Sequence, residues 1–94
     1  MEEGRYNTAK NFIEKGKNMQ SVNIKLSTIE DIRNFVSIVL TFDFEVDLQS
    51  GRYLIDAKSI MGIFSLDLMN PIRLIAHTDD GDMLFSKIKP FVVE

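Results

Sequence analysis

The chain has 94 residues, of which 45% are hydrophobic and 27% charged, and this balance is typical of one folded domain and excludes a disordered segment. The formal net charge of -3 argues against a nucleic-acid-binding face, and the lack of cysteine excludes disulfides, Cys-based zinc sites and thiol nucleophiles. No apolar run is long enough to span a bilayer, and the charged start of the chain, residues 1–17, does not resemble a secretion signal. We therefore expect a cytoplasmic protein without membrane or direct nucleic-acid partners.

Residues 1–19 are predicted to form an N-terminal extension to a domain that spans residues 20–94. The extension is polar and carries few apolar side chains. Phe12 and Ile13 are the apolar residues that would anchor one helical turn, although Gly16 follows soon after them.

The domain opens with a predicted strand and helix. Residues 21–26 alternate between apolar and polar side chains, which is the period of a strand. Ser27 is followed three residues later by Glu30, a spacing that predicts a capping box at the start of a helix. This helix should run to about Phe42, because apolar residues recur at helical spacing. The predicted apolar positions include Ile29, Ile32, Val36 and Val39.

A β-hairpin and a short helix come next. Residues 44–49 and 52–57 have extended character on either side of the turn signal Ser50-Gly51. The segment 58–66 is short and apolar, with Ser59 placed as an N-cap. Asn70-Pro71 ends this region.

The last predicted elements are a strand over residues 72–78 and a final helix. Asp79, Asp80 and Asp82 belong to the turn between them, where acidic groups suit a helix N-terminus. Pro90 should shorten the helix. The resulting order, β-α-β-β-α-β-α, predicts an α+β fold with a four-stranded antiparallel sheet, three helices on one face and the other face open to water.

Residues 58–66, K-S-I-M-G-I-F-S-L, together with this element order, resemble the HPr family. HPr proteins are the small histidine phosphocarriers of the bacterial sugar phosphotransferase system. The resemblance covers roughly residues 20–93 and implies an HPr-like open-faced β-sandwich, a bacterial cytoplasmic protein and a role in the regulation of carbohydrate transport.

The histidine that carries phosphate in this family is missing. It lies at the start of the first helix, in a pattern close to G-x-H-A-R-P-A. An alignment without a gap places Thr28 at the histidine, Glu30 at the arginine and Asp31 at the proline. Two carboxylates would repel a phosphoryl group there. We therefore expect no phosphocarrier chemistry at Thr28, no enzymatic activity and no cofactor.

Ser59 matches a second site of the family. In many Gram-positive HPr proteins this serine is phosphorylated by a dedicated kinase, and the phosphoserine form binds a transcriptional repressor. Ser59 is therefore a candidate for regulatory phosphorylation, with an HPr-type serine kinase and a transcriptional regulator as implied partners. The alternative is that Ser59 serves only as an N-cap.

The short helix has more apolar residues than one inward face can hold. Ile60, Met61 and Phe64 are the candidates for an exposed partner-binding patch, while Ile63 and Leu66 would pack inward. Arg52 and Lys58 are candidates for its charged rim. A further alternative is that Phe12 and Ile13 of the extension cover the patch.

His77 and the acidic residues at 79–82 are the remaining candidates for a phosphate-accepting or metal-binding site. His77 is the only histidine and has no acid partner nearby in sequence, so a partly exposed strand histidine is the simpler interpretation. The acidic residues at 79–82 lack the twelve-residue loop pattern of a calcium site, so helix capping is favoured and no metal is expected.

Three functional hypotheses follow. The first is an HPr-like regulatory module that binds proteins and is controlled at Ser59. The second is a component of the phosphotransferase system that carries phosphate on another acceptor, such as His77. The third is a structural adaptor that is not modified.

Overall fold

The strand predicted near residues 21–26 is β2, which spans Met19–Ile24 in the computed structural model. The structure describes residues 13–16 and 18–93. β2 pairs antiparallel with three strands: β1 (Glu14–Gly16), β5 (Ile72–Ala76) and the short β6 (Val92–Val93). β2 is therefore the strand that joins both ends of the described chain to one sheet.

The predicted hairpin completes the sheet. It consists of β3 (Val46–Ser50) and β4 (Tyr53–Asp56), and β3 also pairs with β5. In the described part of the chain the sheet has six antiparallel strands in the order β1-β2-β5-β3-β4, with β6 pairing with β2 off this path. The four predicted strands are present, and β1 and β6 were not predicted. β1 lies within the segment assigned to the N-terminal extension.

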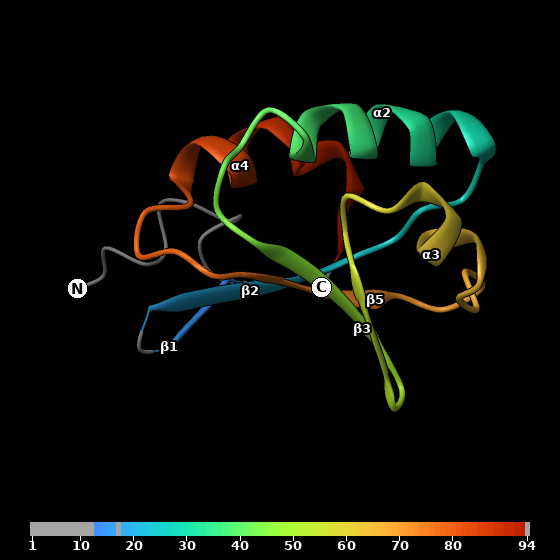
Figure 1. Ribbon diagram of the computed structural model, residues 1–94, viewed down its shortest axis with the longest axis horizontal. Coiled ribbons are helices and arrows are strands. Elements are labelled where there is room, and N and C mark those ends of the chain that lie inside the picture. Colours follow the sequence, from blue (N-terminus) through green and yellow to red (C-terminus); the bar gives the residue numbers. More distant parts are fainter. Residues whose placement is uncertain (1–12, 17, 94) are drawn as a thin grey trace.

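Among residues 13–16 and 18–93, three α-helices lie on one side of this sheet and leave its other side uncovered (Figure 1). They are α2 (Ile29–Val39), α3 (Ile60–Phe64) and α4 (Asp82–Lys87). The prediction of an α+β fold with helices on one face of an antiparallel sheet is confirmed. Within the part of the chain that the structure describes, no helix is long and apolar enough to cross a membrane.

The end of α2 differs from the prediction, whereas the end of α4 agrees with it. α2 ends at Val39 with Leu40 as its C-cap, three residues before the expected Phe42. α4 is followed by a 3-10 turn over Lys89–Phe91, because Pro90 cannot donate a backbone hydrogen bond to continue the α-helix. The predicted shortening by Pro90 is confirmed.

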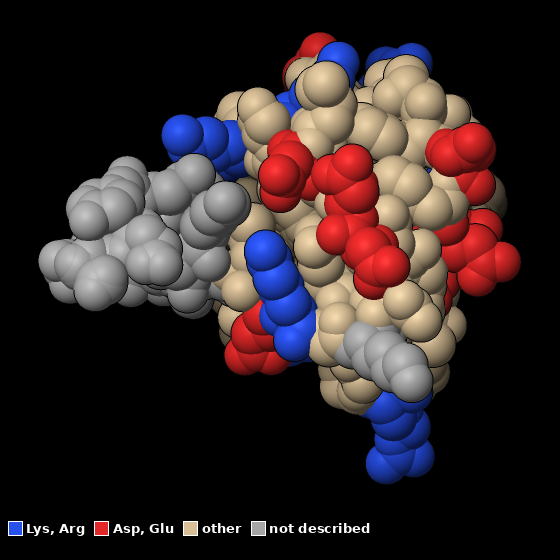
Figure 2. Space-filling view, turned by 90° about the vertical axis from the view of Figure 1, so that its left-hand side faces the viewer, with Lys and Arg blue, Asp and Glu red and all other residues tan. Residues whose placement is uncertain are grey.

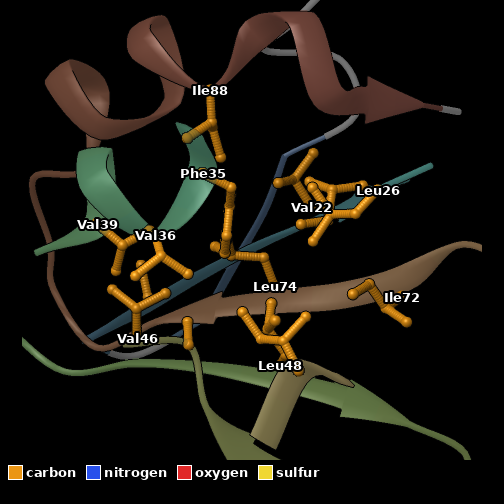
Figure 3. Packing of buried hydrophobic residues seen from close by; sticks show 14 of the residues in the cluster. Val22, Leu26, Phe35, Val36, Val39, Val46, Leu48, Ile72, Leu74 and Ile88 are labelled. Atoms are coloured by element: carbon orange, nitrogen blue, oxygen red, sulfur yellow. The ribbon is translucent and has the colours of Figure 1, made fainter. Parts of the chain in front are cut away.

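The core lies between the sheet and the helices (Figure 3). Every second residue of β2, β3 and β5 points into it, which confirms the predicted alternation. Phe35 of α2 is fully buried and its ring meets that of Phe91 edge to face, with centroids 6.1 Å apart. The largest buried strand residues are Val22, Ile24, Val46, Leu48, Ile72 and Leu74.

The hairpin turn consists of Gly51 and Arg52, since Ser50 still pairs with Tyr53. Gly51 has a φ of 61°, a conformation that glycine adopts without the steric cost of a side chain. The turn places Arg52 at the tip of the hairpin, where it is exposed.

Candidate functional site

The N-terminus of α2 is closed by a reciprocal cap between Thr28 and Asp31. Thr28 has extended backbone (φ -126°, ψ 164°), and its Oγ1 accepts a hydrogen bond from the backbone N–H of Asp31 at 3.0 Å. The Asp31 Oδ2 accepts from the backbone N–H groups of Ser27 at 3.0 Å and Thr28 at 3.2 Å. The capping box predicted from Ser27 and Glu30 is therefore wrong by one residue.

This cap decides what the helix start can bind. Free N–H groups and the helix dipole make a helix N-terminus attractive to anions. Here the Thr28 hydroxyl already accepts from the N–H of Asp31, and the carboxylate of Asp31 accepts from the N–H groups of Ser27 and Thr28, just before the first turn. Glu30 adds a second negative charge in the first turn. The chain therefore supplies its own anion at this position, and Thr28 offers a hydroxyl in place of an imidazole.

Ser59 is the N-cap of α3, as predicted. Its Oγ accepts a hydrogen bond from the backbone N–H of Gly62 at 3.1 Å, and the residue is half-buried. A Cβ at Gly62 would lie 3.2 Å from both Ser59 Oγ and Ile55 Cδ1. α3 thus packs closely on β4. Because Gly62 has no side chain, there is room for the Ser59 hydroxyl to reach the Gly62 N–H.

The apolar residues of α3 divide between the core and the surface. Ile63 is fully buried, and Ile60 is partly buried against the core. Met61 and Phe64 point outward, with 77% and 46% of their surface exposed. Of the three outward candidates, the structure exposes Met61 and Phe64, while Ile60 contributes more to packing.

Ile29 is a further exposed apolar residue at the end of α2 that faces α3. It is the first residue of α2 and is 63% exposed, although its spacing had assigned it to the core stripe. The start of α2 lies at the same end of the molecule as α3, and the two helices are in contact (Figure 1). We call Ile29, Met61 and Phe64 the α2–α3 surface. Sequence analysis missed Ile29, and its position directly after the cap was the available signal.

The two candidate rim residues have different environments. Lys58 is partly buried, and its Nζ donates to the backbone carbonyl of Phe42 at 2.8 Å, so its charge is directed toward the loop after α2. Arg52 is exposed at the hairpin tip and lines an open hollow together with Tyr53 and Ser65. The hollow reaches the C-terminal end of α3, which places Arg52 beside that end of the helix.

The N-terminal extension does not reach the α2–α3 surface with the residues that the structure describes. β1 lies at the opposite edge of the sheet from β4, on which α3 packs. Ile13, just before β1, packs against the core instead. Phe12, the other residue of that alternative, lies outside the described residues.

His77 has an acid partner that the sequence did not indicate. Its Nε2 lies 2.8 Å from Oδ2 of Asp47, which is 30 residues earlier in the chain. The side chain of His77 is 37% exposed, in agreement with a partly exposed histidine at the end of a strand. The expectation that His77 stands alone is wrong, because strand pairing brings Asp47 beside it.

The acidic loop before α4 does not cap the helix as predicted. The N-cap is Gly81, without a side-chain hydrogen bond, and only Asp82 lies in the first turn. Acidic side chains gather at this end of the molecule, on the left of Figure 1 (Figure 2). Across residues 13–16 and 18–93, no group of three or more His, Asp or Glu side chains is arranged to hold a metal ion.

A scan against protein-family models found no match, and a search of curated proteins found no significant match. The assignment of function therefore depends on the site itself and on the sequence resemblance.

Proposed function

We propose that this chain is an HPr-like regulatory module that binds other proteins and carries no phosphocarrier histidine. The observation that supports it most is the α2–α3 surface, where three large apolar side chains are exposed at one end of the molecule. Grouped apolar side chains of this kind are typical of protein-binding surfaces, and methionine suits an adaptable one.

The cap of α2 supports the part of the proposal that excludes a phosphocarrier. A phosphoryl group on Thr28 would lie beside the carboxylate of Asp31, which the N–H of Thr28 holds in place, and it would meet the charge of Glu30. The first turn thus opposes an incoming dianion by its charge.

Regulation at Ser59 is the second part of the proposal. The Ser59 Oγ acts as an acceptor toward Gly62, so the hydroxyl proton does not take part in that hydrogen bond. A phosphate would add a charge of about -1.5 to -2 beside Met61. In the proposal, an HPr-type serine kinase adds this group and a transcriptional regulator recognises the charged and apolar features together.

The modification is tested with an HPr-type serine kinase, ATP and mass spectrometry. Wild type and Ser65→Ala should each gain one phosphate, whereas Ser59→Ala should gain none. Ser65 is the matched control because it is an exposed serine at the other end of the same helix. A wild-type chain that gains no phosphate would remove this part of the proposal.

The docking surface is tested with two methionine variants. Met61→Lys should weaken binding to the kinase or to the regulator by about tenfold or more, since a charge would replace the most exposed apolar side chain of the α2–α3 surface. Met83→Lys is the control, because Met83 is 62% exposed on α4. Equal binding by the two variants would refute the α2–α3 surface as the docking site.

Phosphotransfer through His77 is the second candidate function. The contact with Asp47 favours this function, because a carboxylate beside an imidazole fixes the orientation of the ring. The exposed acidic residues 79, 80 and 82 that follow His77 oppose the approach of a phosphoryl donor. Acid-labile phosphate on His77 that appears only with phosphoenolpyruvate would support this function.

The third hypothesis, an adaptor that is not modified, would be favoured if Ser59→Asp bound the partner protein as tightly as the wild type does.

A further inference from the structure

The outer edge of β4 carries unpaired backbone groups. β4 is the last strand of the sheet order, and no strand within the described residues pairs with its outer side. The strand Tyr53–Asp56 contains no proline and no lysine, the residues that commonly protect an edge from further pairing. Two of its side chains are also large and exposed, since Tyr53 is 66% and Leu54 59% accessible.

The register of the hairpin identifies which groups face outward. Ala57 donates its N–H to the carbonyl of Val46 at 2.8 Å, so this pair is a hydrogen-bonded one. Bonded and non-bonded pairs alternate along an antiparallel ladder, and Ile55 and Tyr53 are therefore bonded to β3. The N–H and C=O of Leu54, and the N–H of Asp56, point away from the sheet.

The charges around Leu54 are self-complementary. Arg52 precedes Leu54 by two residues and Asp56 follows it by two. Asp56 lies directly opposite Asp47 on β3, and like charges placed this way destabilise a sheet. Asp47 is in contact with His77, whereas neither Asp56 nor Arg52 has an ion-pair partner among the side chains that the structure describes.

We propose that β4 pairs antiparallel with β4 of a second copy of this chain, about a two-fold axis at Leu54. The two Leu54 residues would exchange their N–H and C=O groups. Each Arg52 would then lie opposite the partner's Asp56, and the Asp56 carboxylate would gain a cation that the described residues of its own chain do not provide.

The charges of Arg52, Asp56 and Lys58 favour this register over registers whose two-fold axis lies one or two residues further along β4. A two-fold axis at Asp56 would place two carboxylates opposite each other, beside the existing pair with Asp47. An axis at Ile55 would place Arg52 opposite the partner's Lys58. Only the axis at Leu54 matches opposite charges at both ends and satisfies the outward-facing groups of Leu54.

The dimer should be weak and reversible. Two strands of four residues bury less area than a stable interface needs, so association should appear only at high protein concentration. The inference does not depend on the proposed function, because the α2–α3 surface takes no part in the strand pairing.

The test is sedimentation velocity on the full chain, from micromolar to millimolar concentration. The wild type should shift from the mass of one chain toward that of two. Arg52→Glu and Asp56→Lys should each remain at the mass of one chain, because each places like charges at both ends of the pairing. Lys87→Glu, an exposed charge reversal on α4, should dimerise as the wild type does.

A mixture of Arg52→Glu and Asp56→Lys separates loss of pairing from loss of folding. In the mixed dimer the two introduced side chains, a carboxylate and an ammonium, face each other at one end. The unchanged Asp56 of the first variant faces the unchanged Arg52 of the second at the other end, so both ends carry opposite charges. Restored association on mixing would support the proposal. A wild type that stays at the mass of one chain at every concentration would overturn it, as would single variants that dimerise like the wild type.

Discussion

Asp31 and Thr28 hold each other at the start of α2: the hydroxyl of Thr28 accepts from the N–H of Asp31 at 3.0 Å, and the carboxylate of Asp31 accepts from the N–H of Thr28 at 3.2 Å. The pair stabilises the helix, and it also places a carboxylate at the helix end that would otherwise attract an anion. One local contact thus links the start of a helix to the absence of phosphocarrier chemistry in the proposed function.

The first prediction concerns this cap. Thr28→Ala should lower the free energy of unfolding by about 1 kcal/mol, because it removes a side-chain acceptor from the N-cap. Ser27→Ala should change it by less than about 0.5 kcal/mol, since the described hydrogen bond of Ser27 uses its backbone N–H. Urea unfolding followed by circular dichroism measures both. If Ser27→Ala were the costlier change, the cap would lie one residue earlier than in the structure.

The second prediction separates the inward and outward faces of α3. Ile63→Ala should destabilise the protein by about 3 kcal/mol, because it leaves a cavity in the core. Met61→Ala should stay within about 0.5 kcal/mol of the wild type, since Met61 is mostly exposed. Denaturant unfolding of the two variants is the measurement. A similar loss for both would mean that Met61 is packed and unable to contribute to the α2–α3 surface.

The third prediction concerns the close packing of the loop before α4. Gly81→Ala should cost about 2 kcal/mol, because the added Cβ would lie 2.8 Å from both Gln20 Oε1 and Phe85 Cε2. Gly16→Ala is the control, since nothing lies within 4 Å of a Cβ at that position. Thermal unfolding should show a lower midpoint for Gly81→Ala alone. Equal midpoints would show that the Gln20 and Phe85 side chains move aside without cost.

The fourth prediction tests the role of Lys58. Its ammonium donates to the carbonyl of Phe42, so Lys58→Met should lower the free energy of unfolding by about 1 kcal/mol. Affinity for the partner should be unchanged, in contrast to a residue at the rim of the docking surface. Parallel unfolding and binding measurements check this, with Lys87→Met as the exposed control. If Lys58→Met bound the partner more weakly but unfolded at the same free energy as the wild type, Lys58 would be a rim residue of the docking surface after all.

The sequence predicted the elements whose residues carry a clear period or a cap. Val22, Ile24, Val46 and Leu48 alternate along their strands and are buried, and Ser59 caps α3. These sequence patterns are reliable because strand alternation and helix capping are both set by residues that are close together in the chain.

The unpredicted features depend on partners that are distant in the chain. β1 and β6 have three and two residues, too few to show a period, and they exist because β2 offers edges to pair with. His77 acquires Asp47 through the pairing of β3 with β5. The capping box was misplaced because Ser27-Glu30 and Thr28-Asp31 both fit the pattern, and only the structure distinguishes them.

The central claim is that this chain does not act as a phosphocarrier, because the start of α2 has no imidazole and carries two carboxylates. Its most direct test is incubation with labelled phosphoenolpyruvate and the first enzyme of the phosphotransferase system, with an HPr protein that has the histidine as a positive control in the same reaction. The account predicts label on the control and none on this chain. Acid-labile label on a nitrogen atom of this chain would contradict it.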